Sequence, residues 1–98
     1  MTLGELLHRS AAFATVRGSV DIEITAVCDR LDAVVPGSVF VARPGNDTRR
    51  TITEALERGA VAVLSEVAVS LPLKFRASTP FVIVMDCDEA YRLMTAPS

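Results

Sequence analysis

Apolar runs alternate with polar segments along this 98-residue chain. Three of the runs are short, continuous and rich in valine, which is typical of strands buried on both faces of a sheet. They are SVFVA at 38–42, AVAVL at 60–64 and FVIVM at 81–85. A fourth segment, DIEITAVC at 21–28, alternates polar and apolar residues, so it predicts a half-exposed strand at an edge of the sheet.

Helical spacing of apolar residues marks three segments between and around these strands. The first, from about Leu3 to about Ala12, carries leucines at positions 3, 6 and 7. Apolar positions 52, 55 and 56 predict a second helix, and positions 90, 93 and 94 predict a third. The segment 65–80 predicts a loop with a short helical or edge segment, because Pro72 disfavours a central strand.

Each predicted helix has a capping-box pair near its start, in which two side chains satisfy free backbone N–H groups. The pairs are Thr2 with Glu5, Thr51 with Glu54, and Asp86 with Glu89. Gly59 follows the second helix, at the position where a left-handed residue commonly ends a helix.

This order of elements predicts an α/β fold, with a small, mainly parallel sheet and flanking helices in a single domain. The strand at 38–42, the second helix and the strand at 60–64 form one β-α-β unit. Half of the residues are hydrophobic and only 5% are aromatic, so the expected core is aliphatic.

Charge and hydropathy exclude several classes of partner. Ten basic and twelve acidic residues give a net charge of -2, which argues against nucleic-acid binding. No apolar run is long enough to predict a membrane span. The N-terminal MTLGELLHRS lacks the features of a signal peptide, so a cytoplasmic location is expected.

Motifs for catalysis and for cofactors are missing from the sequence. It contains no GxxxxGK[ST], GxGxxG or GxSxG pattern, so no ATP site or hydrolase site is predicted. Cys28 and Cys87 lack the ligand spacing of a zinc site. Both are expected to be small core residues, and the alternative of a reactive thiol at Cys28 rests on its position at the end of a strand.

The loops that follow the first two predicted strands are the candidate binding site. In open α/β sheets, ligands bind beyond the carboxyl ends of the strands. The second of these loops carries arginines and hydrogen-bonding side chains and runs into a helix start, which suits a phosphate group. A polar crossover loop with surface arginines explains the same pattern equally well. The candidate residues are Cys28, Asp29, Arg30, Asp32, Arg43, Asn46, Asp47 and Thr48.

Beyond these local patterns, ITAVCDRLDAVVPGSVFVARPGNDTRRTITEALERGAVAVLSE resembles the N-terminal domain of Mur ligases, most closely the MurE type. PGSVFVARPG at 36–45 and ERGAVAVLSE at 57–66 carry the resemblance, and FVIVMDCDEA at 81–90 looks like a later strand and helix of the family. The similarity covers about residues 3–95. It implies the MurE/MurF N-terminal fold over residues 1–98.

The resemblance also implies a ligand. In the family, this domain holds the UDP part of UDP-N-acetylmuramoyl peptides during peptidoglycan synthesis. By position, the binding loops are 28–32 and 43–48. The family's Asp-Ser-Arg tripeptide falls on Arg30, Leu31 and Asp32, none of which matches, and the second loop is shorter and lacks the DG pair.

The chain ends before the family's ATP-binding segment and its two following domains. No ligase activity is therefore expected from this chain alone, and no cofactor. ATP and magnesium would be needed only if the chain were joined to the ligase domains. Both a ligase fragment and a stand-alone protein fit the sequence.

Two alternatives stand beside this reading. LDAVVPG at 31–37 is similar to a stretch in the N-terminal domain of LpxD, an acyltransferase of lipid A synthesis that also contacts a UDP-sugar. The FVARPG and ERGAVAVLSE segments favour the Mur type. The changed tripeptide motivates a second hypothesis, a non-catalytic interaction domain that keeps the fold, no longer binds a nucleotide and has a cell-wall enzyme as its partner.

Overall fold

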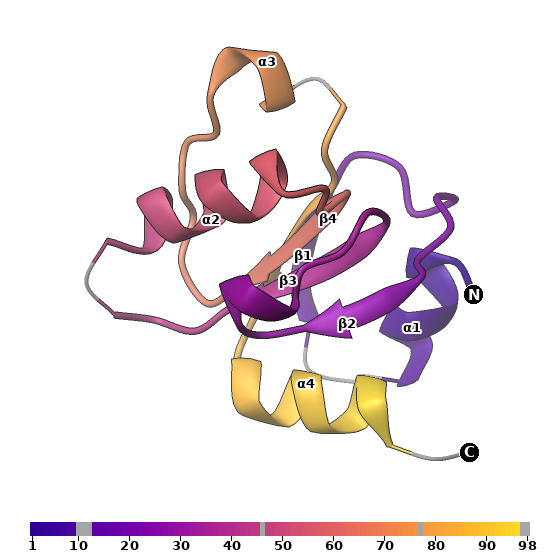
Figure 1. Ribbon diagram of the computed structural model, residues 1–98. Helices are drawn as coiled ribbons and strands as arrows, with labels where there is room; N and C mark the ends of the chain where they lie inside the picture. Colours follow the sequence, from indigo (N-terminus) through magenta and orange to yellow (C-terminus); the bar gives the residue numbers. More distant parts are fainter. Residues whose placement is uncertain (10–12, 46, 77, 97–98) are drawn as a thin grey trace.

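The computed structural model describes residues 1–9, 13–45, 47–76 and 78–96. Within these residues, five strands form one sheet in the order β1-β5-β4-β3-β2 (Figure 1). Four neighbouring strands are parallel, and β1 pairs antiparallel with β5. The predicted α/β class with a mainly parallel sheet is confirmed. The strands are β1 (Phe13–Arg17), β2 (Ala26–Cys28), β3 (Ser38–Ala42), β4 (Ala62–Ser65) and β5 (Phe81–Val84).

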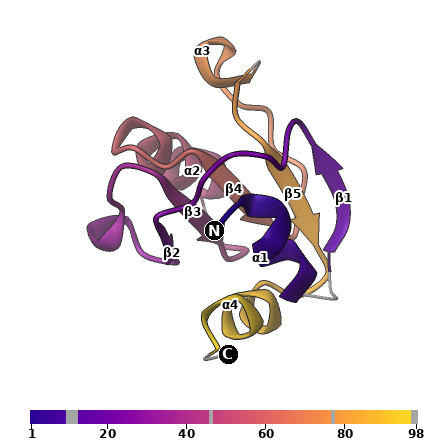
Figure 2. The same ribbon diagram turned by 90° about the vertical axis from the view of Figure 1, so that its right-hand side faces the viewer.

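Helices cover both faces of the sheet. On one face, α2 packs against the strands, and α3 lies beyond it over the same side. On the other face, α1 and α4 lie next to each other, and Figure 2 shows β1 at the edge of the sheet beside β5. The helices are α1 (Leu3–Arg9), α2 (Thr48–Glu57), α3 (Leu73–Arg76) and α4 (Cys87–Thr95), and Leu31–Ala33 forms one 3-10 turn. None of the described helices is both long and apolar enough to cross a membrane.

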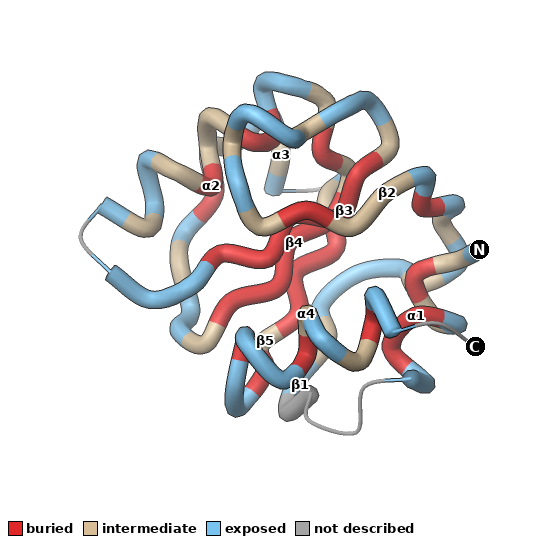
Figure 3. The backbone as a smooth tube through the Cα atoms, turned by 60° about the horizontal axis from the view of Figure 1, so that its bottom comes forward, coloured by how far each residue is buried: buried red, intermediate tan, exposed pale blue. Residues whose placement is uncertain are grey.

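The core consists of two aliphatic layers separated by the sheet. All residues of β3 and β4 are buried, as the red strands of Figure 3 show. Because side chains alternate along a strand, Val39 and Val41 pack toward α1 and α4, while Phe40 and Ala42 pack toward α2. The predicted buried strands at 38–42 and 60–64 are therefore confirmed as β3 and β4. In the 81–85 run, Ile83 is half-buried, and Met85 is exposed and lies outside β5.

The edge strand is shorter than the sequence predicts. Only residues 26–28 of the 21–28 segment pair with β3, although the predicted edge position is confirmed. Residues 22–24 bond to the N-terminus instead, with Leu3 N donating to Ile22 O at 2.9 Å and Ile24 N donating to Met1 O at 2.8 Å. The predicted alternation of buried and exposed side chains holds in this segment: Ile24 is buried and Glu23 is exposed.

β1 is an element that the sequence did not predict. The described part of the expected first helix runs to Arg9, and the rest of its predicted range, residues 10–12, lies outside the described part of the chain. β1 has a single strand neighbour, β5, and its Thr15 and Arg17 are exposed. Its conformation depends on hydrogen bonds to a strand far along the chain, so the local pattern carries little signal.

Two of the three predicted helix caps are confirmed. Thr2 N donates to Glu5 Oε1 at 3.1 Å, and Glu5 N donates to Thr2 Oγ1 at 3.2 Å. At the start of α4, Glu89 N donates to Asp86 Oδ1 at 3.2 Å. These short-range bonds explain why both helix starts could be read from the sequence.

The predicted cap of α2 is wrong. The helix begins at Thr48, one turn before the Thr51–Glu54 pair, and Thr51 Oγ1 donates to the carbonyl of Asp47 at 3.2 Å. The predicted end is confirmed, since Gly59 follows the helix with a φ of 115°. For the segment 65–80, where a short helical or an edge segment was expected within a loop, the structure has a short helix, α3.

Candidate ligand-binding site

The two predicted binding loops begin at the same edge of the sheet. β2 and β3 are parallel neighbours, with Cys28 opposite Phe40, so their carboxyl ends point the same way. The loop after β2 starts at Asp29, and the loop after β3 starts at Arg43. The fold therefore brings together segments that are 14 residues apart in the chain.

Arg43 joins three parts of the chain. Its guanidinium donates to the carboxylates of Asp29, in the loop after β2, and Asp88, in the first turn of α4. It also lies over the Tyr91 ring, 5.4 Å from the centroid. The hydrogen bonds to Asp88 and Asp29 raise the pKa of Arg43 above its usual value. Arg43 is thus a charged clamp between the sheet edge and α4.

Carboxylates outnumber the arginine at this edge. Glu66, at the end of β4, accepts from Cys87 N at 2.9 Å, and Asp86 caps α4. We call the group Asp29, Arg43, Glu66, Asp86 and Asp88 the strand-end cluster. With four acidic groups and one basic group, its potential disfavours an anion and favours a cation.

The other candidate residues of the first loop face different surroundings. The Arg30 and Asp32 side chains form an ion pair at 2.9 Å, with 73% and 68% of each exposed. Cys28 lies in the core, where its thiol is 3.7 Å from the carbonyl of Val39. Asp29, whose side chain is 21% exposed, contacts the second loop through Arg43.

The second loop leads into the start of α2. Thr48 Oγ1 donates to the carbonyl of Gly45 at 3.0 Å, and Asp47 is exposed with a left-handed φ of 60°. Asn46 lies outside the described residues. A groove of about 550 Å³ runs along the exposed side of α2, and Asp47, Arg49 and Arg50 are among its lining residues.

Sequence reasoning missed the contribution of α4 to this site. Asp88 and Tyr91 meet Arg43 across 45 and more residues of chain. The predicted pair of Asp86 and Glu89 accounts for the cap of α4, but it leaves out the contact that Asp88 makes with Arg43. No local pattern reports that contact, because it depends on how α4 packs against β2 and β3.

Among the described residues, no group of three or more His, Cys, Asp or Glu side chains is placed to hold a metal ion. The sequence also has no phosphate-binding glycine-rich motif of the P-loop type. The arrangement can bind and orient a ligand through charge and hydrogen bonds.

Both cysteines are buried and free, as expected of core residues. Burial raises the pKa of the Cys28 thiol, and burial together with Glu66 raises the pKa of Cys87 to about 11. A reactive cysteine needs a lowered pKa and access to solvent. The environment of Cys28 therefore argues against a nucleophilic role.

We expect both thiols to be inert in the folded protein. At pH 8, alkylation of Cys28 and Cys87 should be about one hundredfold slower than in the guanidinium-unfolded chain, because burial blocks the reagent and disfavours the thiolate. Mass spectrometry of peptides after timed iodoacetamide treatment measures each rate. A rate at Cys28 equal to that of the unfolded chain would contradict this expectation.

The chain is similar to two curated ligases along nearly its whole length. It is 28% identical over 99 residues to the UDP-N-acetylmuramoyl-L-alanyl-D-glutamate--2,6-diaminopimelate ligase of Cytophaga hutchinsonii, with 98% of the chain covered. It is 33% identical over 97 residues to the ligase of the same name from Chlorobium phaeobacteroides, with 95% covered. The resemblance to MurE-type Mur ligases is confirmed. No family model matches the chain.

The match covers a limited part of these MurE-type enzymes. The chain spans about a fifth of their length, 20% of one and 18% of the other. At the positions of the MurE-type tripeptide, Arg30 and Asp32 bond to each other. Both side chains are largely exposed, so this is a surface ion pair.

Proposed function

We propose that this chain is a UDP-sugar-binding domain of the MurE type in peptidoglycan synthesis, without ligase activity of its own. The observation that carries the proposal is the whole-chain similarity to two ligases whose name specifies a UDP-N-acetylmuramoyl dipeptide substrate. The ligand of this chain is the UDP part of such a molecule or of another UDP-sugar. Ligation would require ATP and magnesium bound elsewhere.

The geometry supports the loops 28–32 and 43–50 as the contact surface. Both begin at the carboxyl edge of neighbouring parallel strands, where ligands of α/β sheets bind. The exposed Arg49 and Arg50 lie at the start of α2, whose free backbone N–H groups favour a phosphate.

Arg43 is the residue that sets the affinity in this proposal. Its guanidinium is already paired with Asp29 and Asp88. A phosphate must therefore compete with two carboxylates to bind it. The same carboxylates repel the diphosphate through space, because the screening length in physiological salt is about 8 Å. UDP binding is therefore weak in the native chain and limited by these two acids.

Neutralising both acids should strengthen UDP binding. For the double variant Asp29→Asn and Asp88→Asn, we expect UDP affinity to rise about three- to tenfold, because Arg43 is released and two nearby negative charges are removed. Amide NMR titration with UDP, and with UDP-N-acetylmuramoyl-L-alanyl-D-glutamate, measures the affinity and locates the contact. Shifts should concentrate in the loops 28–32 and 43–50.

The matched control is Asp21→Asn, which removes one negative charge from an exposed position outside the strand-end cluster. Its UDP affinity should stay that of the native chain. The proposal fails if millimolar UDP and UDP-N-acetylmuramoyl dipeptide leave both loops unshifted in the native chain and in the double variant.

The acidic strand-end cluster favours one competing function, a protein-interaction domain that binds a basic segment of a cell-wall enzyme. The double variant distinguishes the two functions, because it is expected to change the two affinities in opposite directions. Loss of Asp29 and Asp88 carboxylates would weaken capture of a basic protein segment but strengthen UDP binding. A chain that shows no UDP shifts and loses a cell-wall enzyme from pull-downs on neutralisation would have the interaction role.

A further inference from the structure

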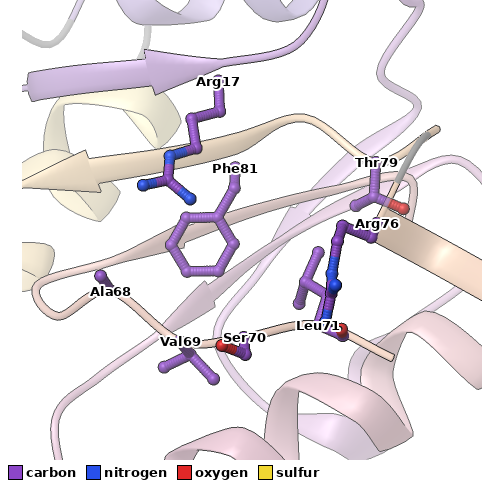
Figure 4. Close-up of a pocket in the computed structure, with 8 residues that line it drawn as sticks. All are labelled: Arg17, Ala68, Val69, Ser70, Leu71, Arg76, Thr79 and Phe81. Carbon is purple, nitrogen blue, oxygen red and sulfur yellow. Dashed lines mark hydrogen bonds between the residues drawn. The ribbon is translucent and has the colours of Figure 1, made fainter. Parts of the chain in front are cut away.

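A second hollow lies at the opposite end of the sheet from the strand-end cluster. It has a volume of about 430 Å³ and lies at the amino end of β5, on the face covered by α2 and α3. Arg17 at the end of β1, Arg76 of α3 and the segment before α3 form its walls (Figure 4). Its volume falls within the usual range of small-molecule sites, about 300–1,000 Å³.

The charge of this hollow is uniformly positive. Its lining contains two arginines and no carboxylate, although the chain as a whole carries a net charge of -2. Among the described residues, none forms a hydrogen bond or ion pair with the side chain of Arg17. Arg76 Nη2 donates to the carbonyl of Leu71 at 3.0 Å, which leaves its other N–H groups available. Arg43, by contrast, is paired with two carboxylates.

The floor of the hollow is apolar. Phe81 and Leu71 are 5% and 6% exposed, and half-buried Val69 lies next to them. In Figure 4 the Phe81 ring lies between Arg17 on one side and Arg76 with Thr79 on the other. A ligand in this place would have an apolar surface beneath it and guanidinium groups at both ends of the ring.

A smaller neighbouring hollow of about 150 Å³ shares Arg17, Arg76 and Thr79. Its lining also contains no carboxylate. Arg17, Arg76 and Thr79 therefore line both hollows, and their side chains carry the N–H and O–H groups that a phosphate or carboxylate accepts from. Arginine pairs with such groups through two parallel hydrogen bonds.

We propose that this hollow binds a small organic anion, with its phosphate or carboxylate between Arg17 and Arg76 and its apolar part on Phe81 and Leu71. The site is separate from the loops 28–32 and 43–50 and does not depend on UDP binding there. It gives the domain a second ligand, of a different chemical class from a nucleotide sugar. Any ligand of this hollow would need one anionic group attached to an apolar body.

Phenyl phosphate and phenylacetate test the proposal by amide NMR titration of the whole chain. Saturable shifts are expected at residues 68–71, at Thr79 and at Phe81. Inorganic phosphate and phenol should each bind more weakly, because each lacks half of the ligand. The tighter of the two aromatic probes identifies the preferred anionic group. Absence of saturable shifts with both would overturn the proposal.

Variants locate the anion. Arg17→Gln and Arg76→Gln should each weaken probe binding about tenfold, since each removes a charge-assisted hydrogen bond. Ser70→Asp, at an exposed lining position, should abolish binding by placing a carboxylate in the hollow. Arg92→Gln on exposed α4 is the matched control and should leave binding unchanged.

Two results would overturn the assignment. One is unchanged affinity in both arginine variants, and the other is equal loss in Arg92→Gln, which would indicate attraction to net charge alone. UDP shifts in the loops 28–32 and 43–50 should persist in Arg17→Gln, so failure of this proposal is distinguishable from failure of the proposed UDP-sugar function.

Discussion

Replacing Phe40 by alanine should lower the free energy of unfolding by about 3–5 kcal/mol. Phe40 lies in the middle of β3, is 1% exposed and is among the largest fully buried side chains. It shares the core layer under α2 with Ile52 and Leu56. Truncation removes buried apolar surface and leaves a cavity that close-packed neighbours fill only in part. Urea denaturation followed by circular dichroism measures the change.

Phe75→Ala is the matched control, since it deletes the same atoms from a half-buried position on α3. Its effect should be less than half that of Phe40→Ala, because the side chain remains partly in water in the native protein. Equal losses of stability in the two variants would show that β3 is not the centre of the core described above.

Gly59→Ala should lower the free energy of unfolding by about 2–4 kcal/mol through backbone strain and overlap. Gly59 has a φ of 115°, and an added Cβ would lie 2.8 Å from the Cα of Pro36. Its carbonyl accepts from Gly37 N at 2.9 Å, so the end of α2 is locked to the turn before β3. An alanine must either separate this contact or adopt a rarely populated conformation. Thermal and urea unfolding measure the effect.

Gly45→Ala is the control for this prediction. Gly45 has no positive φ, and a Cβ added there meets no atom within 4 Å. Its substitution should change stability by less than about 0.5 kcal/mol, as is usual at exposed positions. If Gly59→Ala proved as mild as Gly45→Ala, the packing of the helix end against Pro36 would be wrong.

The two proline-glycine turns around β3 look alike in sequence and differ in the structure. Pro36 and Gly37 pack against Gly59 and Thr25, where a Cβ on Gly37 would lie 2.6 Å from Thr25 Oγ1. The turn at Pro44 and Gly45 is exposed and leads into the second predicted binding loop. The first turn is fixed by its contacts with Gly59 and Thr25, whereas the second lies in solvent.

The candidate site was also predictable only in part, because some of its contacts join segments that are distant in the chain. The loops after β2 and β3 followed from the strand pattern, because parallel strands place their carboxyl ends at one edge. The pairing of Arg43 with Asp29 and Asp88 did not, and neither did its contact with Tyr91. The arginine expected to attract a phosphate is held by Asp29 of the neighbouring loop and by Asp88 of the distant helix α4.

The sequence alone determined the features that depend on neighbouring residues: the buried strands, the caps at Thr2 and Asp86, and the helix end at Gly59. Hydrophobic period and capping act over a few residues, so the local sequence reports them. The tertiary structure decided the antiparallel β1, the acidic strand-end cluster and the positive hollow at Arg17 and Arg76. Those features depend on contacts between distant segments, and these form only when the sheet and its helices are assembled.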